Sequence, residues 1–286
     1  MLLESAFLKL PELMLSSHQH KGSVEAMVVQ HLATGLQMEL NCRSVSFAYN
    51  HIAIETPYPN QNQKGTVFRA DLLFEATGSV PSTSRLEQYG FKENQWLEAK
   101  SFFGRGKSNP ATTQNIGRII KDIIRLCLLP EELQGAIRQN GRYILLVFDS
   151  YPANYLAYSD RAWLKSMFED KSPNLRIDLQ AEKPSLVNAI VNRSSINAQI
   201  EVGLSKHYFE PTVQTPFPVY WGYLLRIDRF AVSINGKSIA SSESIDERWD
   251  KDKIENLKSV RSEFIGMLKS DEGDITNASS RRSKRG

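Results

Sequence analysis

Cysteine is scarce in this sequence, and the arrangement of the two that are present excludes several kinds of site. Cys42 and Cys127 lie far apart, each among apolar residues, and the five histidines are scattered. These residues have neither zinc-finger nor iron–sulfur spacing, so neither kind of metal centre is expected. Thiols with apolar neighbours are typical of a protein core in a reducing compartment. We therefore expect both cysteines to be buried free thiols.

Long apolar runs, a signal sequence and a strong net charge are also missing. No apolar run approaches the length of a membrane span. The N-terminal segment carries Glu4 and Glu12 and lacks the basic start and small-residue cleavage site of a signal peptide. The net charge of +3 at pH 7 permits nucleic-acid binding through a local patch but does not require it. We therefore expect a soluble cytoplasmic protein with no membrane partner.

The order of the expected elements indicates an α/β fold. Residues 1–16 are expected to form a helix, and a second helix follows its N-cap, Ser23. The next elements are strands over residues 44–54, 66–76 and 96–103, a helix over 112–126 and a continuous apolar strand over 143–148. Helix, three strands, helix and strand predict a mixed central β-sheet flanked by helices.

Beyond residue 150 the patterns are weaker. We expect helices over 159–168 and 185–191, a strand over 220–234 and a charged helix over 244–269. From Ser270 the chain is polar and ends in a basic run, which is typical of a disordered tail. The predicted division is a core with N-terminal helices (1–150), an additional C-terminal α+β region that continues the same domain (151–269), and a basic tail (270–286).

The most informative segment is the expected strand Trp96–Phe103, which carries an acid and a lysine two residues apart. Successive side chains of a strand point to opposite faces, so Glu98 and Lys100 share one face while Leu97 and Ala99 share the other. A charged pair on a mostly buried strand costs desolvation energy unless a metal, a substrate or an ion network compensates. The pair is therefore a candidate site.

A second triplet of the same type serves as a comparison, since composition alone predicts roughly two of them. It is Glu169-Asp170-Lys171, in a polar stretch without apolar flanks. A helix end or turn of this composition is expected to lie at the solvated surface. The apolar surroundings, and not the triplet itself, single out Glu98 and Lys100.

A further carboxylate, Asp71, lies among apolar residues on the preceding expected strand. If the two strands are neighbours, Asp71 and Glu98 come close enough to share a cation, and hard oxygen ligands with open positions suit Mg²⁺. Lys100 could then orient or deprotonate a metal-bound water and stabilise charge on a phosphate. The structural alternative is an ion pair between Asp71 and Arg69 at the end of the strand.

This arrangement of an acid on one strand, Glu98-Ala99-Lys100 on the next, and then a helix and a buried strand resembles the PD-(D/E)xK nuclease superfamily. Within that superfamily the chain looks most like a type II restriction endonuclease. The resemblance covers roughly residues 23–150 and implies a restriction-endonuclease-like core. It departs from the family pattern because Ala70, rather than proline, precedes Asp71, and because the gap between Asp71 and Glu98 is long.

The resemblance also implies roles for individual residues. Asp71 and Glu98 would be Mg²⁺ ligands, the backbone carbonyl of Ala99 a further ligand, and Lys100 the residue that positions the water. Members of the superfamily often add a glutamate from the preceding helix, and Glu25 is the best match, although a helix glutamate can also be merely solvated. Glu75, on the same strand face as Asp71, is the alternative ligand.

Residues after the Glu98–Lys100 strand are candidates for DNA contact. Arg105 and Lys107 lie in a glycine-containing loop that could touch DNA phosphates, or could be a plain turn with exposed cations. Gln114 and Lys121, on the helix that follows, are further candidates for contact with the site, and the alternative is an ordinary exposed polar helix face.

The function implied by the resemblance is Mg²⁺-dependent hydrolysis of phosphodiester bonds in double-stranded DNA, at a specific sequence, as part of a prokaryotic restriction–modification system. A homodimer is expected by analogy, because palindromic sites are usually cut by two-fold dimers. Residues 151–269 would supply base contacts and the dimer surface, and a cognate DNA methyltransferase would belong to the system without direct contact. Two alternatives stay open: a structure-selective or repair nuclease on the same scaffold, and a catalytically silent DNA-binding module.

Overall fold

The structure is a computed structural model that describes residues 2–15, 24–58, 68–75, 94–103, 111–129, 140–156, 160–193, 196–212, 219–242 and 251–268. The helices are α1 (Leu2–Leu15), α2 (Val24–Cys42), α4 (Thr112–Cys127), α5 (Ala162–Glu169), α6 (Pro184–Ile190) and α7 (Lys251–Met267), with short 3₁₀ turns η1 (Ala48–His51) and η2 (Pro152–Asn154). The strands are β1 (Ile52–Pro57), β2 (Arg69–Glu75), β3 (Asn94–Phe102), β4 (Asn140–Phe148), β5 (Asn174–Asp178), β6 (Ala198–Phe209), β7 (Trp221–Ile234) and β8 (Lys237–Ser241).

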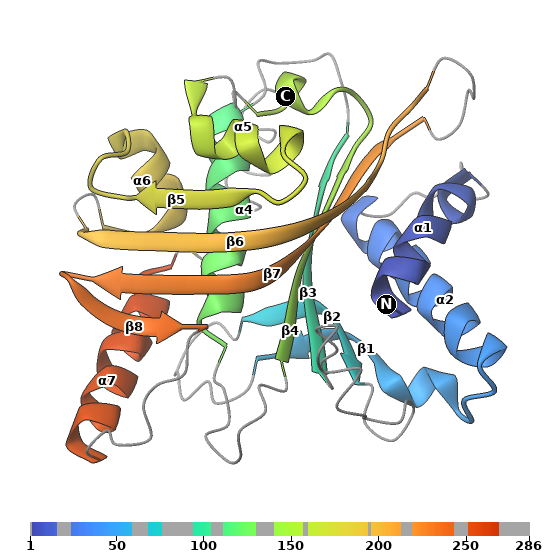
Figure 1. The fold of residues 1–286 in the computed structure, drawn as a ribbon, viewed down its shortest axis with the longest axis horizontal. Coiled ribbons are helices and arrows are strands. Elements are labelled where there is room, and N and C mark those ends of the chain that lie inside the picture. The colour runs from blue at the N-terminus through green and yellow to red at the C-terminus, as the bar shows by residue number, and fades with distance from the viewer. Residues whose placement is uncertain are drawn as a thin grey trace, which may run out of the picture.

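All of these strands belong to one mixed sheet, so the predicted α/β class with a mixed sheet is confirmed. The strand order is β1-β2-β3-β4-β7-β6-β5, and β8 pairs with β7 beside this path. β3 and β4 are parallel, whereas the other neighbouring strands are antiparallel. A parallel pair needs a crossover connection, and α4 lies in the chain between β3 and β4. The sheet runs without interruption from the N-terminal half of the chain into the C-terminal half (Figure 1).

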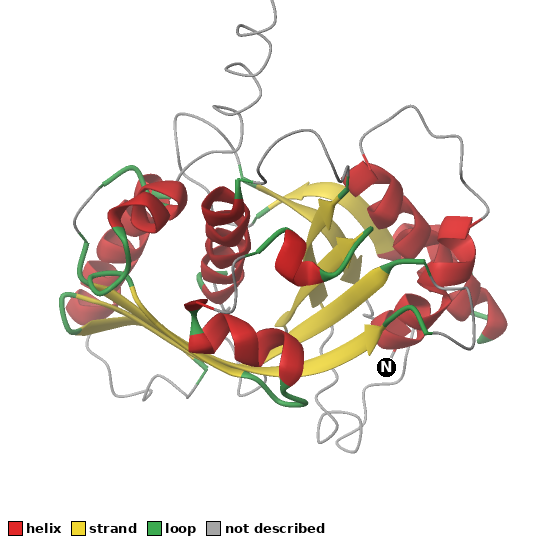
Figure 2. Ribbon diagram, turned by 90° about the horizontal axis from the view of Figure 1, so that it is seen from above, coloured by secondary structure: helices red, strands yellow, loops and turns green. Residues whose placement is uncertain are grey.

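Helices cover both faces of the β1–β4 part of the sheet. α1 and α2 lie on one side and α4 on the other, as the two perpendicular views of Figures 1 and 2 agree. Side chains of β3 alternate accordingly: Leu97 and Ala99 pack with α1 and α2, whereas Trp96 and Phe102 pack with α4. Because Glu98 and Lys100 lie on even-numbered positions of the same strand, they share the α4 face.

Helix α4 is buried almost all round, which forces its charged residues to find partners inside the protein. Five isoleucines at positions 116, 119, 120, 123 and 124 form its apolar surface, and Gly117 packs directly against Ala189 of α6. Lys121, Asp122 and Arg125 are buried with them. A buried charge is tolerated only when it is paired or hydrogen-bonded, so this helix brings an ion network to the sheet.

Most expected helices and strands are present within a few residues of their predicted ends, but two expectations were wrong and three strands were missed. The strand expected over residues 44–54 starts only at Ile52, because Phe47 has a φ of 56° and η1 intervenes. β5, β6 and β8 were not expected. Cys127 is buried as predicted, but Cys42 is exposed, because the last buried residue of α2 is Leu40.

The expected N-cap and the expected tail cannot be compared with the structure, whereas the expected lack of a membrane span can be compared for the described helices. Ser23, the expected N-cap, and the tail 270–286 lie outside the part of the chain that the structure describes. Among the described residues, no helix is long and apolar enough to cross a membrane.

Candidate functional site

The register of β2 and β3 places Asp71 beside Glu98. The two strands pair in antiparallel order from Glu75 opposite Asn94 to Leu72 opposite Leu97, and the next residues in this register are Asp71 and Glu98. Asp71 adds a contact across the strands, since its Oδ2 accepts a hydrogen bond of 2.6 Å from the backbone N–H of Ala99. The two carboxylates that the sequence selected therefore lie on neighbouring strands at adjacent positions.

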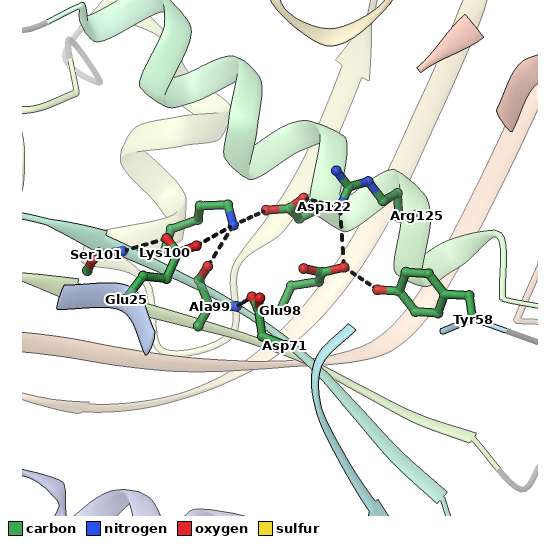
Figure 3. Close-up of polar contacts among 9 residues, drawn as sticks. All are labelled: Glu25, Tyr58, Asp71, Glu98, Ala99, Lys100, Ser101, Asp122 and Arg125. Carbon is green, nitrogen blue, oxygen red and sulfur yellow. Dashed lines mark hydrogen bonds and ion pairs between the residues drawn. The ribbon is translucent and has the colours of Figure 1, made fainter. Parts of the chain in front are cut away.

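Lys100 is the centre of the site (Figure 3). The residue is only 8% exposed, and its Nζ donates to the carbonyl oxygen of Ala99 at 2.7 Å. The same ammonium lies 3.3 Å from Oε1 of Glu25 and 3.2 Å from Oδ2 of Asp122. Strand β3 and helices α2 and α4 thus meet at one cation.

The surroundings of Lys100 keep it protonated. Burial alone lowers the pKa of an ammonium, but the nearby carboxylates, of which Asp122 and Glu25 act most strongly, raise the pKa of Lys100 well above its ordinary value. Lys100 is therefore a fixed positive charge at neutral pH.

Glu25 joins the site from the first turn of α2. In addition to its ion pair with Lys100, its Oε2 accepts a hydrogen bond of 3.4 Å from the backbone N–H of Ser101. The side chain keeps about a third of its surface exposed (34%), so it lies at the rim of the site. Of the two additional acids considered from the sequence, Glu25 is the one that the structure brings to Lys100.

Glu98 is 1% exposed, and its carboxylate is held by two donors from outside β3. Oε1 accepts a hydrogen bond from the hydroxyl of Tyr58, just after β1, and another of 3.5 Å from the guanidinium of Arg125 in α4. Burial raises the pKa of Glu98 well above its ordinary value; Asp122 and Asp71 add to the rise, whereas Arg125 and Lys100 oppose it. Burial and the charge of Glu98 also raise the pKa of Tyr58, so its hydroxyl keeps its proton and donates.

Asp122 and Arg125 are site residues that the sequence analysis did not select. The Asp122 side chain is fully buried, and its Oδ1 lies 3.2 Å from the guanidinium of Arg125 one turn along α4. Neither carboxylate oxygen of Asp122 accepts a hydrogen bond in the described part of the chain, so its partners are the cations Lys100 and Arg125. The available signal was an acid and an arginine three residues apart within a run of isoleucines.

The ionisable groups carry an excess of negative charge. Among the described residues, the site combines four carboxylates with two cations, which leaves a formal charge of −2 if all are ionised: Glu25, Asp71, Glu98 and Asp122 against Lys100 and Arg125. Burial, followed by the smaller effects of Glu25 and Asp122, raises the pKa of Asp71 to about 6 even though Lys100 and the Ala99 N–H oppose the rise. An additional divalent cation would offset this excess.

The donor chemistry fits Mg²⁺, but the described arrangement does not gather a complete ligand set. Carboxylate and carbonyl oxygens are the ligands that Mg²⁺ prefers, and Asp71, Glu98 and the Ala99 carbonyl supply them. No three His, Cys, Asp or Glu side chains of the described residues are placed to hold one ion together. Figure 3 shows the reason: the Glu98 carboxylate lies toward Tyr58 and Arg125, whereas Asp71 lies toward the Ala99 N–H.

Comparison with known proteins adds no family assignment. No family model, curated protein or solved structure matches this chain. The site therefore has to be interpreted from its own residues.

The remaining candidates lie away from these contacts or outside the described residues. Glu75 is exposed and sits opposite Asn94, at the other end of the β2–β3 pairing, so the structure separates it from the site. Asp71 forms no ion pair with Arg69 in the described part of the chain. Gln114 is exposed near the start of α4, about 12 Å along the helix axis from Asp122.

Three basic residues were also candidates for contact with the site or with DNA. Lys121 is buried in α4, but the contact to Lys100 comes from its neighbour, Asp122. Arg105 and Lys107 lie outside the described residues.

Proposed function

We propose that this protein is a Mg²⁺-dependent endonuclease that hydrolyses phosphodiester bonds of double-stranded DNA at a specific sequence. The observation that carries the proposal is that Asp71 of β2 and Glu25 of α2 both contact the Ala99–Lys100 segment of β3, directly after Glu98. The chain order α2-β1-β2-β3-α4-β4, with β3 and β4 parallel, also supports the restriction-endonuclease-like core that the sequence resemblance implies.

The proposed chemistry divides the work among these residues. Asp71, Glu98 and the Ala99 carbonyl would hold Mg²⁺, which supplies Lewis acidity toward the phosphate and lowers the pKa of a water nucleophile. Lys100 offsets the charge that develops on the phosphate in the transition state. Because its pKa is raised, Lys100 acts as a positive charge that orients the nucleophile and not as the base that removes its proton. Glu25 holds Lys100 from the rim of the site.

The C-terminal part of the chain has a proposed role in recognition. β7 pairs with β4 directly beside the site strand β3, so residues 151–269 extend the same sheet. We propose that this region contacts DNA bases and forms a homodimer, which analytical ultracentrifugation of the full chain would test. A DNA methyltransferase encoded by a neighbouring gene would support a restriction–modification system.

The decisive experiment is digestion of unmethylated phage DNA with Mg²⁺ by the wild type, Lys100→Met and Lys171→Met. We expect discrete fragments from the wild type, a rate about 10²- to 10³-fold lower for Lys100→Met, and unchanged cleavage for Lys171→Met, which alters the exposed triplet in the same way. A nuclease that contaminates the preparation would be equally active in all three.

The other outcomes separate the alternatives. Cleavage confined to branched DNA or to DNA ends would favour a structure-selective or repair nuclease. Binding of DNA without cleavage by the wild type, under Mg²⁺ or Mn²⁺, would overturn the enzymatic proposal and favour a silent binding module.

A further inference from the structure

We infer that Tyr58 and Arg125 form a clamp that holds Glu98 away from Asp71 and thereby sets the affinity of the site for a divalent cation. The inference rests on the proposed function, because it concerns how the same site takes up its ion. Tyr58 and Arg125 are positioning residues here: both act on the substrate only through Glu98.

The clamp uses one oxygen of Glu98 and two donors from different parts of the fold. Oε1 accepts hydrogen bonds both from the hydroxyl of Tyr58 and from the guanidinium of Arg125. With Glu98 1% exposed, water is not available to replace a donor that is lost. The carboxylate can therefore leave the clamp only if another cation or donor receives it.

The two arms of the clamp are fixed more firmly than Glu98 itself. The guanidinium of Arg125 is paired with Asp122 at 3.2 Å and lies over the ring of Phe68, 4.8 Å from its centroid. The ring of Tyr58 packs against Trp96, with centroids 5.5 Å apart. When the site takes up a divalent cation, the side chain of Glu98 is therefore the part that moves.

Asp71 is held in a way that does not compete with an ion. Its Oδ2 accepts from the backbone N–H of Ala99, and in the described part of the chain its Oδ1 accepts no hydrogen bond. Asp71 can thus contribute an oxygen without giving up a partner, whereas Glu98 must give up Tyr58 and Arg125. Loss of one arm of the clamp should make ion binding tighter, because Glu98 then has one hydrogen bond fewer to break before it reaches the ion.

Tyr58→Phe tests this inference, because the variant keeps the ring and removes only the hydroxyl. Titration calorimetry of the full chain with MnCl₂, without DNA, should give a dissociation constant about tenfold lower than that of the wild type, the effect of one hydrogen bond to a charged group. Tyr143→Phe is the matched control, since Tyr143 is also buried and donates to a buried carboxylate, Glu4, at 3.3 Å on the opposite face of the sheet. Its affinity for Mn²⁺ should equal that of the wild type.

A second measurement needs no variant. Addition of MnCl₂ or MgCl₂ to the wild type should produce a tyrosine ultraviolet difference spectrum as Tyr58 loses its carboxylate acceptor, and Tyr58→Phe should lack this signal. A residue with only a structural role would not tighten ion binding on removal of its hydroxyl.

The outcomes separate the clamp from the proposed function. Suppose that the wild type binds Mn²⁺ and that Asp71→Asn abolishes this binding. If Tyr58→Phe then binds Mn²⁺ no more tightly than the wild type, the clamp is overturned and the proposed ion site stays in place. Absence of any Asp71-dependent binding in the wild type would overturn both.

Discussion

The two acid-x-lysine triplets of this protein have the same ionic pattern and opposite surroundings. Glu98 and Lys100 lie on β3, between β2 and β4 and beneath α4, and are 1% and 8% exposed. Glu169 and Lys171 lie at the end of α5 and beyond it, and both are exposed. The buried triplet collects acids from α2 and α4, whereas Glu169 pairs with Lys165 one turn away at 3.7 Å, with about half of each side chain exposed (49% and 54%).

This difference shows how the position of a strand in the sheet determines how strongly its charged side chains interact. Ion pairs in water are worth little, because solvent screens them and side-chain entropy opposes them. Inside the protein the same charges interact strongly and shift one another's pKa values, as Asp71, Glu98 and Lys100 do. A pattern of charged residues becomes a candidate site only where neighbouring strands and a covering helix exclude water.

The largest expected difference between the triplets is in stability. Lys100→Met leaves the buried carboxylate of Asp122 without one of its two cations, and we expect it to lower the free energy of unfolding by about 3 kcal/mol at pH 8 in the absence of divalent ions. Lys171→Met should change it by less than about 0.5 kcal/mol. Urea unfolding measures both, and equal effects would remove the distinction on which the site is based.

The next largest expected difference between the buried and the exposed triplet is in the pH dependence of divalent-ion binding. Because the pKa of Asp71 is raised to about 6 and the pKa of Glu98 is raised as well, protons should compete with a divalent cation for both ligands, and below pH 6 the Mn²⁺ affinity should fall by at least about tenfold per pH unit. Asp71→Asn should abolish the dependence together with binding, and Glu169→Gln should leave it unchanged. Calorimetric titrations between pH 5 and pH 8 provide the measurement.

In the absence of a divalent ion, the Asp71 carboxyl should make the protein less stable as the pH rises, whereas Mn²⁺ affinity rises with pH. The folded-state pKa of Asp71, about 6, exceeds the ordinary aspartate pKa of 3.8, so its contribution to stability is fully present at low pH and is lost as pH rises through about 6. Thermal unfolding with and without Mg²⁺ across this range should show the ion restoring stability at the higher pH. An ion-free pH profile that Asp71→Asn leaves unchanged would contradict the raised pKa.

The smallest expected effect concerns the rim of the site. Glu25→Gln removes a charge that faces Lys100, and we expect about a tenfold loss of cleavage rate, as is typical when a residue that supports a ligand or catalytic group is changed. Glu75→Gln, an identical change at an exposed position at the other end of the β2–β3 pairing, should have no effect. A larger loss for Glu75→Gln would reverse the assignment of these two acids.

The sequence was sufficient to predict the position of those site residues whose side-chain direction follows from strand alternation. The apolar pattern of β3 placed Glu98 and Lys100 on one face, and the apolar flanks of Asp71 placed it on a neighbouring strand. β6 could have been predicted in the same way, because Ala198, Ile200, Val202 and Leu204 alternate with polar residues and glycine. β5 and β8 are five residues long, and their pairing with β6 and β7 is what makes them strands.

Other features depend on contacts that sequence spacing does not encode. Helix α4 is almost entirely buried from Ile116 onward, so its polar positions there do not mark a solvent face, and the orientation of Asp122 toward Lys100 follows from how α4 crosses β3. The contact of Tyr58 with Glu98 joins residues forty positions apart. A charged residue in the buried part of a helix needs a partner inside the protein, and only the tertiary structure identifies that partner.

The central position of β4 has a consequence for how this protein can change during evolution. β4 is apolar on both faces and pairs with β3 on one edge and β7 on the other, so a fragment ending near residue 150 would present an unpaired hydrophobic edge. Such an edge promotes aggregation, and the C-terminal region could not be exchanged as an independent module. New properties in that half of the molecule would have to arise by substitution within the existing sheet.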